Sequence, residues 1–378
     1  MLRDAKDGPT SGDLTSCHAG RAMQRQDLSA VADLFARVFR GGVRAPDDGL
    51  EAYLETLCFG SPHWTPQTGS LVYEAPPGEI HAAILSVPMR FRADGEPIVG
   101  RLLGSFMADG KEGKRGAAWL SRHFRARNHD LLFSDTARAV SADHWRVAGG
   151  QVLPIHSLDW TRVFRPLGSI ALRLERGRSR TGRALAYLPY ALPDTLLRKA
   201  RPSLCAQMPA GYGIEETDRA GFLAAAGSML PRFTVHPDWD AAELDWLGEL
   251  VAGNRHLGPL HLRLVTGGDA KPVAVYAYCG NGRGKATVLN LLCRERREAD
   301  AVSALYAELD AAGYALAGGM VQRFLMTALQ RHRHVSFRHR GFFCIASRRD
   351  AVNEAARQGQ FYAGGFASET WSRLLTDF

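Results

Sequence analysis

Residues 109–124, DGKEGKRGAAWLSRHF, place three glycines and three basic residues at the entrance of an apolar-striped helix. Strand-like segments at 70–75, 80–91 and 97–107 precede this stretch, and Asp94 and Gly95 form a hairpin-type turn signal between the last two. The first turn of a helix has free N–H groups and a partial positive charge, and glycine permits close approach of a ligand. The stretch therefore predicts an anion-binding turn; a basic surface turn before an ordinary helix is the alternative.

Helical and strand-like patterns continue on both sides of this stretch and then recur in a related order. The first series contains helices at 27–40 and 49–58, the three strands, the helix after residue 109, a strand at 130–134, a helix at 141–148 and a strand at 151–156. The second series contains helices at 218–230 and 241–252, strands at 261–266, 272–279 and 286–293, a helix at 299–312, and strands near 314–321 and 341–347. The pattern predicts an α/β (α+β) fold in which mixed, mostly antiparallel sheets are flanked by helices.

A break in composition separates the two series. Residues 173–183, RLERGRSRTGR, are charged and Gly-rich, and prolines follow at 189, 193, 202 and 209. We therefore expect a disordered tail at 1–25, an N-terminal domain at 26–170, a linker at 171–212 and a C-terminal domain at 213–378.

Composition is that of a globular protein without a membrane span. Hydrophobic residues make up 46% and charged residues 23% of 378 residues, and no apolar run approaches the ~20 residues that cross a bilayer. The six cysteines are scattered without a Cys-x-x-Cys pair, which argues against a zinc site or a disulfide framework and favours a cytoplasmic location. The net charge of +8 is compatible with anionic ligands.

The quoted stretch and its surroundings resemble the GNAT acyltransferase superfamily. Members hold the pyrophosphate of acyl-CoA in a [Q/R]-x-x-G-x-[G/A] loop between the fourth strand and the third helix. Gly116 and Ala118 fill the last two motif positions, while Gly113 stands where Gln or Arg is usual. Residues 130–166 also resemble the family in the order of their predicted elements, and Trp145 stands at the position of the family's tyrosine.

The resemblance implies two tandem GNAT-like domains, with acyl-CoA or acetyl-CoA as a substrate of the first. The second domain has no glycine in the corresponding turn, RERREADAV. Strand backbone near the thioester carbonyl is expected at Phe106, Met107 and Ala108, and the cofactor turn at Lys111, Gly113, Lys114, Arg115, Gly116, Ala117 and Ala118. No metal is expected.

The proton donor is the open question, because tryptophan cannot supply a proton as the family's tyrosine does. Asp135, at the end of the predicted fifth strand, and His156 are the candidate catalytic residues. The alternatives are a helix cap or turn residue for Asp135 and a hydrogen-bonded strand histidine for His156. His332 and His334 are expected to alternate on a strand, which suits either a metal or a solvated basic face.

The function implied by the resemblance is acyl-CoA-dependent N- or O-acylation of a small molecule, amino sugar or secondary metabolite. A GNAT-fold enzyme that uses acyl-carrier-protein thioesters, or that decarboxylates an acyl thioester, is one alternative. A non-catalytic binding module is another. An acidic carrier protein would suit the basic chain, and nucleic acid is not an expected partner.

Overall fold

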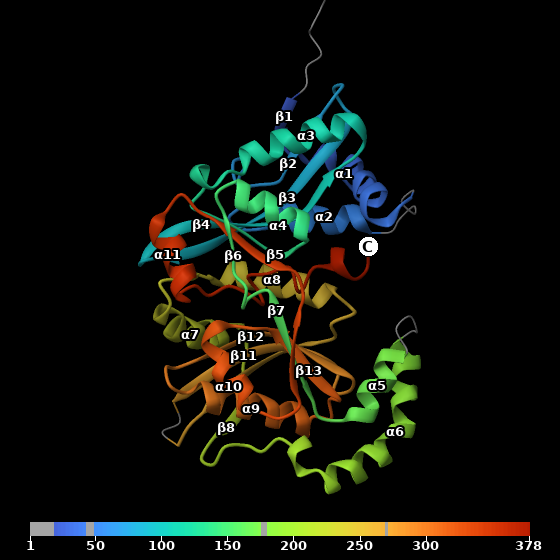
Figure 1. Cartoon of the computed structure of the whole chain (residues 1–378), viewed down its shortest axis with the longest axis vertical. Coiled ribbons are helices and arrows are strands. Elements are labelled where there is room, and N and C mark those ends of the chain that lie inside the picture. The colour runs from blue at the N-terminus through green and yellow to red at the C-terminus, as the bar shows by residue number, and fades with distance from the viewer. Residues whose placement is uncertain (1–18, 43–48, 175–179, 269–270) are drawn as a thin grey trace, which may run out of the picture.

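Two mixed β-sheets with flanking helices lie one above the other along the long axis of the molecule (Figure 1). This computed structural model describes residues 19–42, 49–174, 180–268 and 271–378. The predicted fold class is confirmed. Within the described ranges, no helix is both long enough and apolar enough to cross a membrane.

The first sheet contains one parallel pair, between β4 and β5, among antiparallel neighbours. Its order is β1 (Ala19–Ala22), β2 (Leu71–Glu74), β3 (Ile80–Ala93), β4 (Glu96–Ala108), β5 (Leu131–Ala137), β15 (Phe342–Ala346) and β6 (Gln151–Val152), with β9 (Val235–Pro237) beside β3. Helices α1 (Leu28–Phe35) and α2 (Leu50–Phe59) pack on one face, against Leu85 and Leu102. Helices α3 (Gly110–His123) and α4 (Ala139–Val147) lie on the other, near Ile84 and Leu103.

The second sheet repeats this plan with β12 and β13 as its parallel pair. Its order is β14 (Val335–His339), β7 (Leu158–Val163), β13 (Leu316–Met320), β12 (Lys285–Cys293), β11 (Pro272–Cys279), β10 (Leu260–Thr266) and β8 (Gly213–Glu216). Helices α7 (Arg219–Met229) and α8 (Ala241–Gly253) cover one face; α9 (Glu298–Ala311) and α10 (Met326–Gln330) cover the other. Helices α5 (Pro166–Leu174), α6 (Arg180–Ala200) and α11 (Asp350–Gln358) complete the chain.

The two sheets exchange a strand. Strand β7 follows the first sheet in sequence but pairs with β13 and β14, so that Trp160 lies opposite Gly319 and Phe337. Strand β15 returns to the first sheet, where Ile345 lies between Phe133 and Gln151. Each sheet is therefore completed by the other half of the chain.

Most predicted helices and strands form within a few residues of their expected bounds, and three segments differ. The strand expected at 151–156 ends at Val152. His332 and His334 precede β14, and a positive φ of 59° at His334 places it in a turn. Part of the expected tail is β1, where Arg21 forms ion pairs with Asp27 and Glu74; residues 1–18 lie outside the described residues.

The expected linker at 171–212 contains the end of α5 and all of α6, Arg180–Ala200. Asp194 of α6 is buried, and its carboxylate accepts hydrogen bonds from the backbone N–H groups of Leu167 and Gly168. Arg198 forms an ion pair with Asp310 of α9. The first contact joins α6 to α5, and the second attaches α6 to helix α9 of the second unit.

The glycines of α3 allow the helix to lie close to the first sheet. A Cβ atom at Gly116 would lie 2.7 Å from both Tyr73 Cδ1 and Ala82 Cβ, and one at Gly113 would lie 2.8 Å from the carbonyl oxygen of His81. Both distances are well inside van der Waals contact, so a side chain at either position would push α3 away from the sheet.

We expect Gly116→Ala to lower the free energy of unfolding by about 1–3 kcal/mol, because overpacking at this contact outweighs the better helix propensity of alanine. Gly227→Ala in α7 is the matched control, since nothing lies within 4 Å of its added Cβ. It should stabilise by about 0.5–1 kcal/mol. Urea unfolding measures both; equal stabilisation of the two variants would contradict the packing role.

Candidate functional site

Strands β4 and β5 separate halfway along their length. Their parallel pairing runs from Gly100 opposite Leu131 to Leu102 opposite Phe133 and then stops. At this point β4 also has a bulge, because Leu85 of β3 lies opposite Gly104 but Ala83 lies opposite Met107. A bulge leaves backbone groups outside the ladder. The polar backbone of Ser105 and Phe106, with a φ of 46° at Ser105, is therefore available where the strands part.

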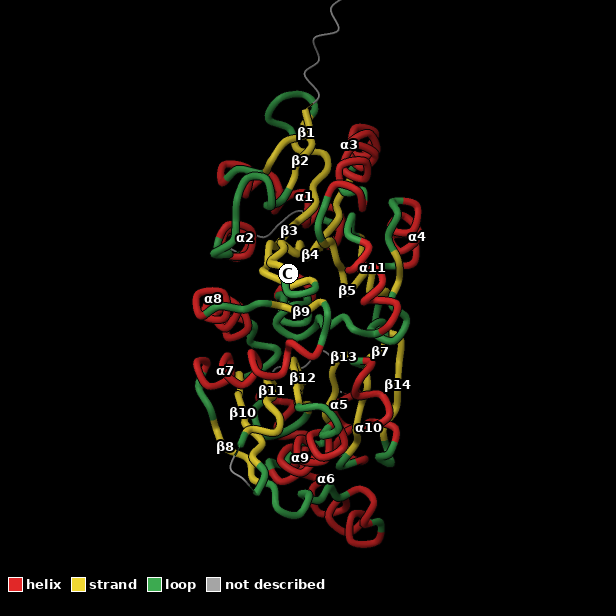
Figure 2. Tube along the Cα trace, turned by 90° about the vertical axis from the view of Figure 1, so that its left-hand side faces the viewer, coloured by secondary structure: helices red, strands yellow, loops and turns green. Residues whose placement is uncertain are grey.

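A cavity of about 690 Å³ opens at this separation. Its wall combines the bulge of β4, the end of β5, helices α3 and α4, the end of the first helix, and the C-terminal segment. Figures 1 and 2 both show the C-terminus at the level between the two sheets. Its lining includes Ser105, Phe106, Thr136, Arg138, Trp145 and Glu369.

The lining of the cavity includes two positively charged side chains. Arg138, at the start of α4, and Arg40 both line it, and no ion pair joins Arg138 to a carboxylate within the described ranges. Arg37 lies nearby and is 3.0 Å from Asp109, the residue before α3. The two arginines that line the cavity therefore suit an anionic group.

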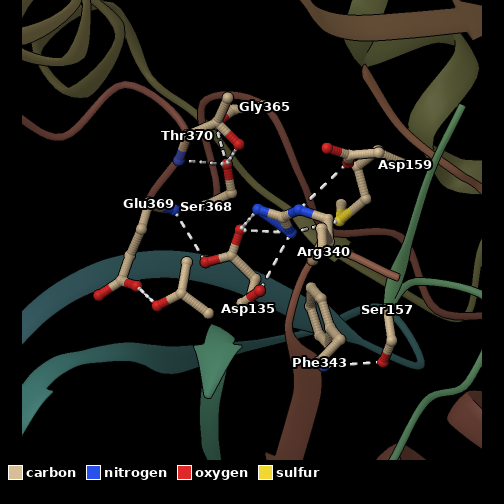
Figure 3. A network of polar contacts seen from close by, with 12 residues as sticks. Asp135, Ser157, Asp159, Arg340, Phe343, Gly365, Ser368, Glu369 and Thr370 are labelled. Atoms are coloured by element: carbon tan, nitrogen blue, oxygen red, sulfur yellow. Dashed lines mark hydrogen bonds and ion pairs between the residues drawn. The ribbon is translucent and has the colours of Figure 1, made fainter. Parts of the chain in front are cut away.

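The C-terminal segment brings Glu369 to the bulge (Figure 3). The backbone N–H of Glu369 donates to Asp135 Oδ1 at 2.9 Å, and the hydroxyl of Thr136 donates to the Glu369 carboxyl. A Cβ atom at Gly104 would overlap Glu369 Oε1, so this glycine gives the carboxyl its place on β4.

The Glu369 carboxyl is weakly acidic in this position. Burial, and then the negative charge of Asp135, raise its pKa to about 8. Arg340 partly offsets the charge of Asp135, because its guanidinium lies 2.7 Å from Asp135 Oδ2. The carboxyl therefore exchanges its proton close to neutral pH.

The two predicted catalytic residues occupy different places. Asp135 is fully buried and binds Arg340 and the Glu369 N–H, so it lies behind Thr136 and Glu369, which line the cavity. His156 is buried against Phe343 and Phe361, outside the residues that line the cavity, and burial lowers its pKa to about 4.

Among the predicted cofactor residues, Phe106 is the one that lines the cavity. Met107 is buried in the core and Ala108 is partly buried. In α3, Lys111, Lys114, Arg115 and Ala118 are exposed, Ala117 is partly exposed, and Gly113 and Gly116 face the sheet. The cavity instead meets this helix at Leu120, Ser121 and Phe124.

Gly104, Arg138 and Glu369 are among the residues of the site that were not predicted. Gly104 interrupts an otherwise apolar strand, RLLGSFM, and such a glycine is a recognisable sign of a bulge or close approach. Arg138 has no distinctive pattern around it. Glu369 lies 233 residues after Thr136, and no local pattern connects them.

The corresponding separation in the second sheet is filled. Strands β12 and β13 pair from Lys285 to Val288 and then part, and residues 361–367 occupy the space beyond. Asn290 donates to Tyr362 and to the carbonyl of Gly364, and accepts from the Phe366 N–H. A Cβ atom at Gly365 would overlap Asn290. The described part of the chain thus has an open separation in one sheet and a closed one in the other.

No family model and no curated protein matches the sequence. Solved structures do resemble the fold. A probable N-acyltransferase of unknown function from Enterococcus faecalis aligns over 86% of this chain and 72% of its own, with a TM-score of 0.55 and 10% identity. A GCN5-related N-acetyltransferase from Anabaena variabilis aligns over 89% and 75%, with a TM-score of 0.55 and 10% identity.

A third structure, a GCN5-related N-acetyltransferase from Kribbella flavida, aligns over 89% of this chain and 72% of its own. Its TM-score is 0.50 at 13% identity. At such low identity these similarities concern the fold alone. They confirm the recognition made from the sequence: the chain has a GNAT-like fold, with two mixed sheets arranged as two GNAT-like units.

Within the described residues, no three His, Cys, Asp or Glu side chains lie close enough together to hold a metal ion. His332, which the sequence offered as a possible ligand, instead lies against the ring of Tyr306 and near Ser303.

Stability should depend on pH through Glu369. An unfolded glutamate has a pKa of about 4.3. Between that value and about 8, the folded protein keeps a proton that the unfolded chain has lost, so this contribution to stability declines as the pH rises. The slope is at most ~1.4 kcal/mol per pH unit.

We expect Glu369→Gln to remove this decline when unfolding by urea is followed from pH 5 to 9. Glu354→Gln, at an exposed position of α11, should keep the wild-type decline of stability with pH. Parallel curves for wild type and Glu369→Gln would show that the carboxyl ionises as an ordinary surface glutamate does.

Proposed function

We propose that the cavity of the first sheet binds an acyl-CoA, and that the protein transfers its acyl group to an amine or hydroxyl of a small molecule. The observation that carries this proposal is the separation of β4 and β5 at a bulge, with a cavity of about 690 Å³ at that point. A thioester carbonyl placed there would meet backbone N–H groups that the ladder leaves free, which stabilises the developing oxyanion.

The residues present fit an acyl-CoA. Between the separated strands, the amide groups of the acyl-CoA can form the hydrogen bonds that a neighbouring strand would otherwise form. The phosphates would lie near Arg138 and Arg40, which line the cavity and offer donors. In this arrangement the exposed Lys111, Lys114 and Arg115 supply a positive field around the phosphates rather than the cavity wall.

A second, smaller pocket favours a short acyl group. It has a volume of about 20 Å³, adjoins the cavity at Ser105 and Glu369, and is walled by Leu85, Val87 and Trp371. Such a volume holds roughly one water-sized group. Its apolar wall suits the methyl group of an acetyl chain.

The acceptor is proposed as a small molecule with an amine or hydroxyl, such as an amino sugar or secondary metabolite. Transfer from a carrier-protein thioester, decarboxylation of an acyl thioester and binding without catalysis would use the same cavity. Mass spectrometry of the products formed from acetyl-CoA and malonyl-CoA separates these functions.

Acetyl-CoA should raise the melting temperature of the wild type, because a ligand that binds the folded state stabilises it by mass action. Arg138→Glu should weaken binding by about tenfold or more in calorimetry, since it replaces a phosphate donor by a negative charge. Arg331→Glu, at an exposed position in the second half, is the matched control and should bind as the wild type does. Absence of binding by the wild type would contradict the proposal.

Affinity should fall, or at best stay level, from acetyl-CoA to octanoyl-CoA. A longer pocket would gain about 0.8 kcal/mol for every buried CH₂ group, whereas the small apolar pocket offers no room for this gain. Competition calorimetry compares the two ligands. Markedly tighter binding of octanoyl-CoA would show that the acyl chain lies outside the small apolar pocket and is buried elsewhere.

A further inference from the structure

The C-terminal segment is held at both ends of its path between the two sheets. Residues 361–367 fill the separation in the second sheet, as described above. The indole N–H of Trp371 donates to the carbonyl of Phe366, and Asn254 donates to the carbonyl of Trp371. Glu369 lies between these attachments, so its position at the first cavity is fixed by packed structure.

Among the described residues that line the cavity, Glu369 supplies the one carboxyl group. It retains partial exposure, and both the cavity and the small apolar pocket reach it at Gly104 and Ser105. His144 is another titratable residue of the wall, but it is exposed on α4. The carboxyl therefore lies beside the bulge where the thioester carbonyl is proposed to sit.

Resting on the proposed acyl transfer, we propose that Glu369 is the catalytic residue that accepts the proton of the acceptor amine and returns it to the sulfur of CoA. This role is the one left open by Trp145, which lines the cavity at the position of the family's tyrosine and cannot donate a proton.

The step balances without any further reactant. The nitrogen of a neutral amine attacks the thioester carbon, an N–C bond forms, and the amine proton passes to the Glu369 carboxylate. The tetrahedral intermediate then collapses, the C–S bond breaks, and its electron pair leaves on sulfur. The protonated carboxyl returns the proton to this thiolate, which yields an amide and CoA thiol.

The surroundings of Glu369 suit a carboxyl that works in both directions. Burial and Asp135 of β5 favour its protonated form, whereas Thr136 and Arg340 favour the carboxylate. A pKa of about 8 makes its carboxylate a stronger base than that of an exposed glutamate. This value also lies close to the ordinary pKa of a thiol, so the carboxylic acid can return the proton to the thiolate. Gly104 contributes no charge and gives the carboxyl room.

The test compares wild type, Glu369→Gln and the control Glu354→Gln. Calorimetry with acetyl-CoA at pH 7 comes first and tests the proposed function; glutamine is neutral, as Glu369 largely is at that pH, so all three proteins should bind alike. Release of CoA thiol is then followed with a panel of amino sugars, polyamines and amino acids. We expect kcat for the best amine to fall at least 100-fold in Glu369→Gln, and the wild-type rise of kcat with an apparent pKa near 8 to disappear.

Infrared titration needs no acceptor. The wild type should lose a carboxylic-acid C=O band between pH 6.5 and 9.5, and Glu369→Gln should lack that band. Its absence from the wild type would overturn the assignment whether or not any amine is acetylated. Equal kcat values and pH profiles in wild type and Glu369→Gln would also overturn it, while leaving the proposed function intact. Failure of the wild type to bind acetyl-CoA would instead refute the proposed function.

Discussion

The ion pair between Asp135 and Arg340 connects the two halves of the chain at the point where the candidate site is built. Asp135 is fully buried at the end of β5, and Arg340 precedes β15, the strand that the second half contributes to the first sheet. Loss of one partner of a buried pair leaves an uncompensated charge and typically costs about 3–5 kcal/mol. The same carboxylate accepts the N–H of Glu369, so the exchanged strand and the C-terminal segment depend on one neutralised group.

The two sheets share a separated parallel strand pair, but the space between the strands is filled in one sheet and open in the other. Both have a parallel pair that separates partway along. In the second sheet, Asn290 binds the chain's own residues 361–367 through three hydrogen bonds. In the first sheet, the space remains a cavity. The segment that closes the second separation continues into the wall of the first, so closure of one site contributes to the construction of the other.

The order of helices and strands could be read from the sequence, because periodicity and turn residues are local properties. The residues of the candidate site were harder to predict. Gly113 and Gly116 signal a close approach to the backbone of α3, but the sequence cannot distinguish a ligand from the neighbouring sheet, and here the sheet makes the contact. Strand β15 would have the same apolar pattern in either sheet, so its own sequence does not reveal that it pairs with the first sheet. Glu369 reaches the site only through that long-range arrangement.

The exchange also bears on how the chain is made. Arg340 follows Asp135 by 205 residues, so the edge of β5 has no partner until these further residues have left the ribosome. At about 5–20 residues per second, this delay is roughly 10–40 s. An unpaired strand edge invites association with other chains during that interval. Biosynthesis of this fold therefore places a demand on the cell's chaperones that two independently completed domains would avoid.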